Sequence, residues 1–583
     1  MGKSDQNLSR RRMLVGAGAA TAALGAVKLS PSTAEAAENW DRETDILVVG
    51  SGIGATSAAV VAHDNGDQVI MLEKAPFVGG TSAKSAGVLW IPNNYVLKER
   101  GIEDSKSDCL QYMARYSYPQ RFDPSSPTLG LRPDKYALLE AFYDNASDAA
   151  DLMRENGALN LTEWRMFALD HPATDYLDHV PENKVSAGRA IGVLKSDGTV
   201  GVGSHMMAQM GAAVKKRNIP VLTGHQATDL VRDESGRVVG LKVAQGKKMI
   251  SVGARKAVIF ASGGYAHNRD FVADNQRARM YGSCAMPMAT GDFIKIAGAA
   301  GARMGNMSGA WRTQVLLDEA IKSSVLALGV FLPPGDSAFQ VNKYGRRAVN
   351  ESGNYNDRAE VHGVFDTSKA EYPNQLMFMI YDQRTAEAFA GMYPLPETPK
   401  GAPHVISGDT VEDLTTNLAQ RLQEIAPHTG GLSLDPAFAA NLEATRQRFN
   451  GFARSGKDED FQRGDAKYDV EWKLAWGGMR KDSTWPSNEG PSVNMYPLQD
   501  SGPYYAIMLG AGALDTNGGP AIDARARVLD TYGQPIPGLY GVGNCIASPS
   551  REAYWGAGCP LALSLTYGYI AASDAHGDAR KEA

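Results

Sequence analysis

Glycines that follow a short apolar segment offer backbone that can approach a phosphate group closely. Gly50 and Gly52 come directly after the apolar run 45–49, and Ile53 opens a small, apolar stretch typical of a helix packed on a sheet. Gly50 permits a tight turn, and Gly52 lets a pyrophosphate reach the backbone. The helix N-terminus adds free N–H groups and the positive end of its dipole. This spacing predicts a site for a dinucleotide.

An acidic residue completes the pattern. Glu73 ends the next apolar run, 69–72, and lies about 20 residues after the first glycine, where a carboxylate accepts hydrogen bonds from ribose hydroxyls. The third glycine position holds Ala55, and Gly54 comes one residue early. Alanine is tolerated there because close packing of helix on strand is the only demand. A second glycine loop follows at 79–82.

The elements that must position these residues are a strand, a glycine turn, a helix and a second strand that ends on an acid. This order predicts an α/β fold with a Rossmann-like domain of the glutathione-reductase type. Two later strands return to the same site, one at 257–260 that leads into Ser262-Gly263 and one that stops at Gly543-Asn544. Near the end of the chain Pro560 opens a further helix, and proline suits the first helical turn.

The length of 583 residues indicates two or more domains. We expect residues 37–305 and 498–583 to form a discontinuous nucleotide-binding domain with a helical insertion at about 95–215, and 306–497 to form an α+β capping domain. The segment 164–189 is polar and irregular, which is typical of a loop over a site. A net charge of −6 without a long basic run argues against nucleic-acid binding.

The first 36 residues have the pattern of an export signal. Arg10 and Arg11 precede a mildly apolar stretch at 14–27, and Ala34-Glu35-Ala36 offers a cleavage site. Twin arginines indicate the Tat route, which exports folded proteins, so we expect a periplasmic or secreted protein. A membrane anchor is the alternative, but the stretch is too short and too rich in glycine to span a bilayer well. We expect no stable membrane insertion of the mature chain.

The cysteines give no sign of a metal or haem site. Cys109, Cys284, Cys545 and Cys559 form no C-x-x-C pair, no haem-attachment motif and no metal-ligand spacing. We expect four buried thiols and no metal. A disulfide between two of them is the alternative in an oxidising compartment, and the sequence does not indicate which two would pair.

Several motifs together resemble one flavoprotein family. The chain contains GSGIGA, EKAPFVGGTSAKSAG, ASGG, ATGD, RRAVNE, GGPAIDARARVLD and GLYGVGN, and as a set these resemble the family of succinate dehydrogenase and fumarate reductase. The resemblance implies bound FAD, a cap domain, and a substrate held between cap and flavin. The histidine that holds FAD covalently in succinate dehydrogenases is absent at 83–86, so the FAD should be non-covalent. The residues expected to contact FAD are Gly50, Gly52, Ile53, Gly54, Ala55, Glu73, Lys74, Gly80, Thr81, Ser82, Gly87, Ala227, Ser262, Gly263, Asp292, Gly543, Asn544, Pro560 and Leu561.

Within that family, two segments are similar to those of 3-ketosteroid Δ1-dehydrogenases. One is LWIPNN at 89–94, and the other is Tyr554-Trp555-Gly556-Ala557-Gly558, which is similar to their Tyr-Pro-Gly-x-Gly turn. Trp555 and Cys559-Pro560 depart from that turn and leave the steroid itself open, because the turn touches the substrate. Fumarate reductases carry an arginine acid where this chain has Tyr355, and their second arginine is absent as well. This argues against a dicarboxylate substrate.

The resemblance also implies roles. Dehydrogenation beside a ketone removes a proton from the alpha carbon and a hydride from the beta carbon, and it needs a polarised ketone oxygen. The Tyr554 hydroxyl and the Gly558 N–H are the candidates that polarise this oxygen. Tyr355 is the candidate base, and Tyr176 is expected to lower the pKa of Tyr355 through a hydrogen bond.

We therefore expect an FAD-dependent dehydrogenase that introduces a C=C bond alpha,beta to the ketone of a cyclic, steroid-like substrate. The electron acceptor is not identified. The alternatives are an exported ene-reductase of the fumarate reductase type and a flavin-binding electron carrier without turnover. His171 and His179 are alternative acids or bases beside Tyr176, and Arg358 is an alternative arginine acid.

The export signal yields a first prediction. Replacing Arg10 and Arg11 with lysine should prevent export, because a protein that folds around its cofactor in the cytoplasm can leave only by the Tat route. Cell fractionation followed by immunoblotting measures the effect. Undiminished protein in the periplasm or medium would show that this signal does not act as predicted.

Overall fold

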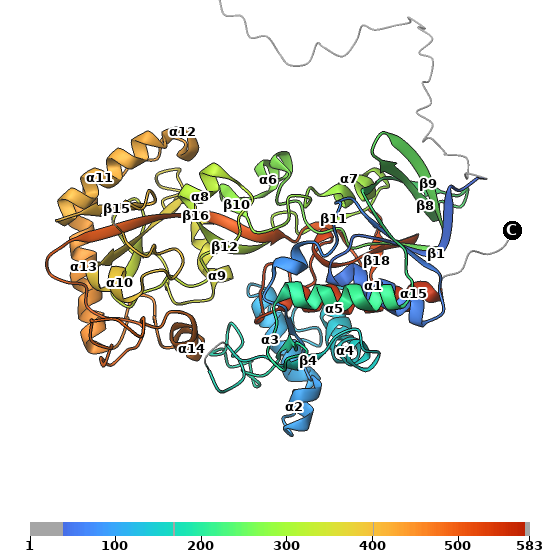
Figure 1. Cartoon of the computed structure of the whole chain (residues 1–583), viewed down its shortest axis with the longest axis horizontal. Helices are drawn as coiled ribbons and strands as arrows, with labels where there is room; N and C mark the ends of the chain where they lie inside the picture. The colour runs from blue at the N-terminus through green and yellow to red at the C-terminus, as the bar shows by residue number, and fades with distance from the viewer. Residues whose placement is uncertain (1–38, 167–168, 400, 578–583) are drawn as a thin grey trace, which may run out of the picture.

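Two β-sheets organise the chain, and the larger one carries the first glycine turn (Figure 1). The computed structural model describes residues 39–166, 169–399 and 401–577, so the predicted export signal lies outside the described residues. The parallel part of the larger sheet runs in the order β19 (Pro535–Gly541), β9 (Lys248–Phe260), β1 (Arg42–Val49), β2 (Val69–Glu73) and β6 (Val221–Thr223). Three antiparallel strands extend this sheet. β18 (Arg527–Leu529) pairs with β19, β8 (Val238–Gln245) pairs with β9, and β7 (His225–Arg232) pairs with β8.

Helices pack against this sheet. Ten residues of α1 (Ile53–Asp64) are buried, since α15 (Cys559–His576) and α5 (Gly203–Lys216) lie beside it (Figure 1). The contact between α1 and α15 is close enough that a Cβ on Gly568 would lie 2.5 Å from the carbonyl oxygen of Gly54. Small residues in these helices therefore permit the approach that the sequence pattern indicates.

The predicted elements of this sheet are present with shifted ends. β1 begins at Arg42 rather than at residue 45, and β9 begins at Lys248 rather than at residue 257. The two strands pair along this extra length, with Arg42 opposite Val252. Pairing between strands, and not apolar character, thus sets where they begin, because the three residues added to β1 are polar and two of them, Arg42 and Glu43, are exposed.

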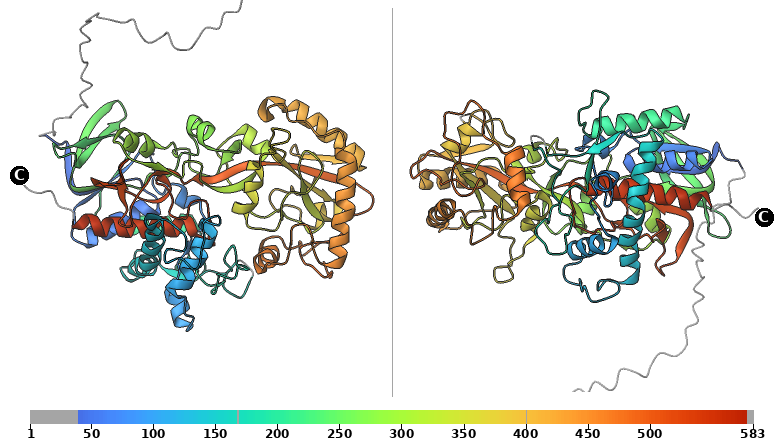
Figure 2. Two further views of the ribbon diagram at one scale, coloured as in Figure 1. Left: turned by 180° about the vertical axis from the view of Figure 1, so that it is seen from behind. Right: turned by 90° about the horizontal axis from the view of Figure 1, so that it is seen from below.

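The smaller sheet has six strands and its own helical cover. Its path runs through β10 (Met280–Ser283), β16 (Tyr504–Thr516), β14 (Leu376–Asp382) and β13 (Ala338–Val341), and β12 (Ala310–Leu316) and β15 (Val405–Gly408) also pair with β16. α11 (Val411–Glu424) and α13 (Phe438–Ser455) cover one face with apolar residues. β16 runs from this half of the molecule toward the larger sheet, as two opposite views show (Figures 1 and 2). The sheet thus takes β10 and β16 from outside the predicted 306–497 boundary.

Shorter elements complete the described chain. A three-stranded sheet joins β3 (Val88–Trp90), β5 (Ala190–Val193) and β4 (Leu161–Glu163), and β11 (Met304–Gly305) pairs with β17 (Gly519–Pro520). The remaining α-helices are α2 (Tyr95–Glu99), α3 (Lys106–Ser117), α4 (Pro133–Glu155), α6 (Arg269–Asn275), α7 (Asp292–Ala299), α8 (Leu317–Lys322), α9 (Tyr355–Ala359), α10 (Gln383–Ala388), α12 (Ala426–Thr429) and α14 (Lys467–Trp476). Three short 3₁₀ turns lie at Thr81–Lys84, Glu360–Gly363 and Gly543–Cys545.

The four cysteines are buried free thiols, as predicted. In the part of the chain that the structure describes, no helix is both long enough and apolar enough to cross a membrane.

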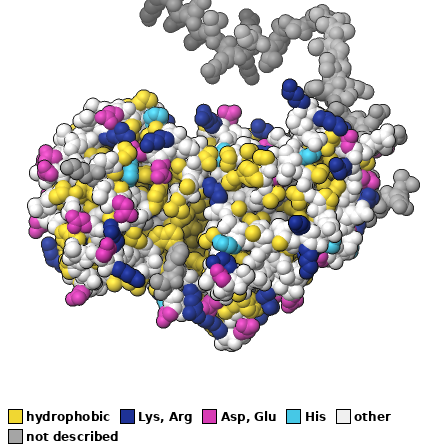
Figure 3. Space-filling model, viewed as in Figure 1, with side chains coloured by type: hydrophobic (Ala, Val, Ile, Leu, Met, Phe, Trp, Pro, Cys, Tyr) yellow, Lys and Arg dark blue, Asp and Glu magenta, His cyan; other side chains and the backbone are white. Residues whose placement is uncertain are grey.

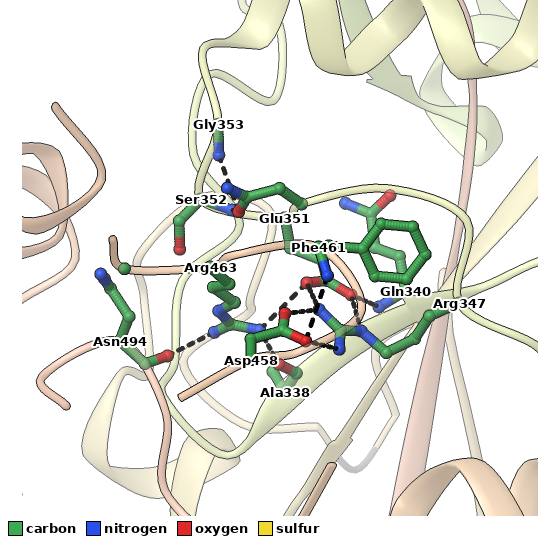
Figure 4. A network of polar contacts seen from close by, with 12 residues as sticks. Ala338, Gln340, Arg347, Glu351, Ser352, Gly353, Asp458, Phe461, Arg463 and Asn494 are labelled. Carbon is green, nitrogen blue, oxygen red and sulfur yellow. Dashed lines mark hydrogen bonds and ion pairs between the residues drawn. The ribbon is translucent and has the colours of Figure 1, made fainter. Parts of the chain in front are cut away.

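A buried network of charges holds the segment that leads into α9 (Figure 4). The Arg347 guanidinium donates to Glu351 at 2.8 and 2.7 Å and to Asp458 at 3.1 and 2.7 Å. Arg463 lies 3.4 Å from Glu351 and donates to the Ala338 carbonyl oxygen at 2.7 Å. Burial opposes ionisation of Glu351, but the two guanidinium groups hold the pKa of its carboxyl below the usual value. The network fixes the chain just before Tyr355.

This network predicts a large stability effect. Glu351→Gln removes the carboxylate charge and leaves two buried guanidinium groups under-compensated, which typically costs about 3–5 kcal/mol. We expect a lower urea midpoint of the holoprotein, measured by circular dichroism. Asp460→Asn, which breaks the more exposed Arg448 pair at 2.6 Å, should shift the midpoint little. Equal shifts in the two variants would contradict the role assigned to Glu351.

Candidate active site

A cavity of about 510 Å³ runs between the two halves of the molecule. Its lining includes the glycine turn after β1 at one end and several tyrosines at the other. In the space-filling view, hydrophobic side chains gather in the hollow between the halves (Figure 3). Of the residues predicted to contact FAD, the lining includes Gly50, Gly52, Ile53, Gly54, Glu73, Lys74, Gly80, Thr81, Ser82, Ala227, Ser262, Gly263, Asp292, Gly543, Asn544, Pro560 and Leu561.

The glycine turn forms a cradle that side chains would fill. Gly50 has φ +115°, and a Cβ there would lie 2.3 Å from the Ala261 carbonyl oxygen. A Cβ on Gly54 would lie 2.9 Å from Val542 Cγ1. Gly52 caps α1 without a side-chain hydrogen bond, so the positive end of the helix dipole faces this cradle. These features fit a pyrophosphate group.

Glu73 lies at the end of β2 and is already held in place. One carboxylate oxygen accepts from the Ser51 hydroxyl at 2.6 Å, and the other accepts from the Ala75 N–H at 2.8 Å. Ser51 in turn accepts from the Gly79 N–H at 3.0 Å, which ties the two glycine loops together. The Glu73 carboxylate is thus fixed in the cavity wall beside both glycine loops.

Lys74 and Asp292 form an ion pair on the same side of the cavity. Lys74 Nζ lies 2.9 Å from an Asp292 oxygen and 2.7 Å from the Thr290 hydroxyl. Burial opposes ionisation of Asp292, but the Lys74 ammonium outweighs it and lowers the pKa of the Asp292 carboxyl. The negative charge of Asp292 is therefore maintained at neutral pH.

Two predicted residues do not line the cavity. Ala55 is fully buried inside α1, and its small side chain serves helix packing. Gly87 has φ +70°, and a Cβ there would lie 2.6 Å from the carbonyl carbon of Val202. Its need for glycine comes from the contact with the start of α5, so backbone packing explains this position.

At the other end of the cavity, three tyrosines from distant segments meet. The hydroxyls of Tyr176 and Tyr355 lie 3.0 Å apart. The Tyr176 and Tyr554 rings stack with centroids 5.0 Å apart, and the Tyr355 ring meets the Tyr554 ring edge-on at 5.5 Å. Tyr554 and Gly558 both belong to the turn that leads into α15. All four predicted catalytic residues line the cavity together.

Local structure fixes each member of this cluster. Tyr355 is the first residue of α9, whose N-cap Asn354 accepts from the Asp357 N–H at 2.9 Å. Tyr176 donates its backbone N–H to the Trp555 carbonyl at 3.2 Å. Gly558 caps α15 with φ +90°, where a Cβ would lie 2.3 Å from the Val88 carbonyl oxygen.

The expected effect of Tyr176 on its neighbour is wrong. Burial raises the pKa of Tyr355 well above 10, and the Tyr176 hydroxyl raises this pKa further, whereas the hydrogen bond from Tyr554 lowers it. Burial likewise raises the pKa values of Tyr176 and Tyr554. The reason is that desolvation disfavours a phenolate, and the neighbouring rings carry no positive charge to offset it.

The alternative acids and bases do not reach the cavity. All five N–H groups of Arg358 are occupied, by the Gln314 side chain and by the carbonyl oxygens of Glu351, Gly353, Val330 and Phe331. Arg358 therefore supports the walls around Tyr355 from behind. His171 lies near Glu471 at a partly exposed position and His179 lies near Asp178 at an exposed one, and neither lines the cavity.

Several cavity residues were not predicted. Trp472 and Trp476 lie one turn apart on α14, and together with Phe331, Trp311 and Trp164 they line the cavity with aromatic rings. The i, i+4 spacing of the two tryptophans was the available signal. His225 and Asp515 also line it. Asp515 accepts from the Gly264 N–H at 2.9 Å and from Asn544 at 3.1 Å, and burial raises the pKa of its carboxyl to about 6.

A buried ion triad lies behind the tyrosine cluster. Arg189 donates to both oxygens of Asp104 at 2.9 and 2.7 Å and to Asp175 at 2.6 Å. Asp175 also accepts from Trp90 Nε1 at 2.7 Å. These residues fix the loop that carries Tyr176, and they give the tryptophan of the LWIPNN stretch a structural role.

The fold and the cavity are those of a dinucleotide-binding protein built on two main β-sheets. The chain belongs to the family defined by an FAD binding domain, whose model matches residues 45–561. FAD is thus its cofactor, and the glycine cradle and Glu73 suit it. The protein is an FAD-dependent oxidoreductase of the class that acts on CH–CH groups.

Characterised relatives span nearly the whole chain. A 4-oxocyclohexanecarboxylate 2-dehydrogenase of Sinomonas cyclohexanicum is 30% identical over 92% of this chain and 93% of its own. A 3-oxosteroid 1-dehydrogenase of Mycolicibacterium smegmatis is 29% identical over 91% of this chain and 97% of its own. A fumarate reductase (cytochrome) of Shewanella frigidimarina is 26% identical over 91% of this chain and 76% of its own.

Solved structures share the fold. The 3-ketosteroid delta1-dehydrogenase from Sterolibacterium denitrificans, in complex with 1,4-androstadiene-3,17-dione, superposes with a TM-score of 0.74 at 24% identity, covering 92% of this chain and all of that one (100%). The open conformation of a flavocytochrome c3 fumarate reductase gives 0.62 at 23% identity, covering 93% of this chain and 79% of that one.

The linkage of FAD to the protein is open to a simple test. We predict non-covalent binding, because the stretch at 83–86 holds no histidine to link the flavin. Acid precipitation of the purified holoprotein should leave a yellow supernatant whose flavin chromatographs as FAD. Flavin that stays with the precipitate would contradict the prediction and would direct attention to His225 in the cavity wall.

Proposed function

We propose that this protein dehydrogenates a cyclic ketone and introduces a C=C bond alpha,beta to the carbonyl group. The observation that carries the proposal is the cluster of Tyr176, Tyr355 and Tyr554 with Gly558 at one end of the cofactor cavity. It combines hydrogen-bond donors for a ketone oxygen with a tyrosine, Tyr355, whose phenolate form takes a proton. The names of two relatives, which act on a 3-oxosteroid and on 4-oxocyclohexanecarboxylate, support this reaction class.

Each residue has a distinct task in this proposal. The Tyr554 hydroxyl and the Gly558 N–H donate to the ketone oxygen, which makes the alpha proton more acidic. The Tyr355 oxygen takes that proton, and the Tyr176 hydroxyl at 3.0 Å orients Tyr355. FAD, when bound, would supply the acceptor for the hydride that leaves the beta carbon. The positive N-terminal end of α15, which Gly558 caps, favours the negative charge that develops on the ketone oxygen.

The reverse reaction on a dicarboxylate finds less support. Among the described residues no arginine lines the cavity, and Arg358 has no N–H left to donate. A dianion buried beside aromatic rings without such partners is costly. A simple electron carrier, in turn, would have no use for a hydroxyl cluster at the end of the cavity.

The site of action is a further part of this proposal. We propose that the protein is exported by the Tat route and acts in the periplasm or outside the cell, on the strength of Arg10 and Arg11.

The central prediction concerns Tyr355. Tyr355→Phe keeps the ring and removes only the hydroxyl, so FAD content and thermal stability should stay near those of the parent. The rate of flavin reduction by a 3-keto substrate should fall at least about 100-fold, since general-base catalysis contributes about 10²–10⁴-fold. Anaerobic stopped-flow absorbance of the flavin measures this rate. Tyr468→Phe is the matched control, because Tyr468 is buried with its ring 5.1 Å from that of Tyr176 and does not line the cavity.

The same measurement carries a pH signature. A base acts when deprotonated, and the fraction of phenolate rises tenfold for each pH unit below its pKa. Because burial raises the pKa of Tyr355 well above 10, the parent rate should climb through the alkaline range without a plateau below pH 10. Tyr355→Phe should lose this slope. A plateau near neutral pH, or a variant as fast as the parent, would rule out Tyr355 as the base.

A further inference from the structure

One polar group beside the tyrosine cluster has no partner. The Trp472 indole nitrogen Nε1 is buried and makes no hydrogen bond with any residue that the structure describes. Trp472 itself is 5% exposed and lines the cavity. An indole N–H can only donate, so it needs an acceptor. Leaving such a donor unpaired in a protein interior is unfavourable, which is why each native case calls for an explanation.

The position of Trp472 is fixed by its surroundings. Its ring lies edge-on to Tyr355 at 6.2 Å and to Tyr176 at 6.3 Å, and it stacks on Trp476 at 5.8 Å. The preceding residue, Glu471, is buried and accepts from the Thr174 hydroxyl, which anchors α14 to the loop that carries Tyr176. The indole ring therefore belongs to a well-packed wall of the reacting end of the cavity.

The neighbouring groups do not satisfy this donor. Aromatic faces of nearby tyrosines accept hydrogen bonds only weakly, so they replace an oxygen acceptor poorly. The Tyr176 and Tyr355 hydroxyls are hydrogen-bonded to each other. An acceptor supplied by the ligand is the arrangement that satisfies the N–H, and Trp side chains in binding sites are commonly paired in this way.

We propose that Trp472 Nε1 donates a hydrogen bond to a second, uncharged oxygen of the substrate. This inference rests on the proposed function and narrows its substrate class. The centroids of the Trp472 and Tyr355 rings lie 6.2 Å apart, so we place the second oxygen on the reacting ring or on a group attached directly to that ring. The substrate class is then a cyclic ketone with an additional carbonyl or hydroxyl group.

The charges near Trp472 favour an uncharged oxygen. Lys467 pairs with Glu471 at 3.2 Å, and Lys473 donates to the Gly335 carbonyl oxygen. With both of these ammonium groups engaged, a carboxylate at the indole would be buried without either of them as its partner, which is costly. The relative from Sinomonas cyclohexanicum is named for a substrate that carries a carboxylate. For this chain we propose an uncharged second oxygen instead.

A pair of ring ketones that differ in one oxygen tests the inference. Cyclohexane-1,4-dione offers a second carbonyl oxygen, and cyclohexanone does not. Binding is measured by calorimetry on the chemically reduced holoprotein, where hydride transfer to the flavin cannot occur. The kcat and KM of flavin reduction are measured separately on the oxidised holoprotein. We expect the parent to bind the dione at least about 10-fold more tightly, because a site built to hydrogen-bond an oxygen rejects the analogue that lacks it.

Trp472→Phe removes the N–H and keeps an aromatic ring. It should raise the KM for the dione to about that for cyclohexanone and so abolish the preference for the dione. The matched control is Trp485→Phe, because Trp485 Nε1 donates to Glu387 at 2.6 Å in the same half of the molecule, away from the cavity. This control should keep the preference.

The outcomes separate the two proposals. A preference that survives in Trp472→Phe overturns the role of the indole, as does a parent protein that binds both ketones equally or binds neither. If the parent prefers the dione, Trp472→Phe loses that preference, and no cyclic ketone bleaches the flavin, the indole contact stands and the proposed dehydrogenation fails. Tight binding of 4-oxocyclohexanecarboxylate, equal to that of the dione, overturns the requirement for an uncharged oxygen.

Discussion

The carbonyl oxygen of Trp555 is the acceptor on which the tyrosine cluster depends. It accepts from the Tyr176 backbone N–H at 3.2 Å and from the Tyr112 hydroxyl at 2.5 Å. The Trp555 ring is fully buried, with Trp90 and Phe142 each 5.3 Å away. The turn before α15 is thus fixed to α3 and to the loop over the cavity at once. Because Tyr554 directly precedes Trp555, any movement of this turn would separate Tyr554 from Tyr176.

The opposite wall of the site is held by buried charges. Arg347, Glu351, Asp458 and Arg463 fix the segment before Tyr355, and Arg358 binds the carbonyls around it (Figure 4). Buried ion pairs contribute little net stability, because desolvation offsets their attraction. Their directional contacts do specify one arrangement of the chain. Both walls of the cavity therefore rest on polar networks, and the small residues between them leave room for FAD.

The sequence predicted the cofactor half of this site better than the other half. The glycine turn, α1, β2 and Glu73 are neighbours in the chain, so their local spacing carries the information. Arg189 and Asp104 are far apart in sequence, and their pairing depends on how the loop folds back. The polar segment 164–189 was expected to form a loop over the site, but its sequence did not reveal that Asp175 and Arg189 are buried together. The pKa of Tyr355 was misjudged for the same reason, since the sequence does not reveal burial.

Burial of the tyrosines has two opposing consequences for the proposed reaction. A phenol with a raised pKa is rarely ionised at neutral pH, but its oxygen is a stronger base when it is. Proton transfer to the Tyr355 phenolate is fast enough only if the alpha proton of the substrate becomes more acidic at the same time. Donation from Tyr554 and from the Gly558 N–H to the ketone oxygen meets that need, and the N-terminus of α15 adds its positive dipole end. The Tyr554 ring meets the Tyr355 ring edge-on at 5.5 Å, so the side chain that acidifies the substrate lies beside the base that receives its proton.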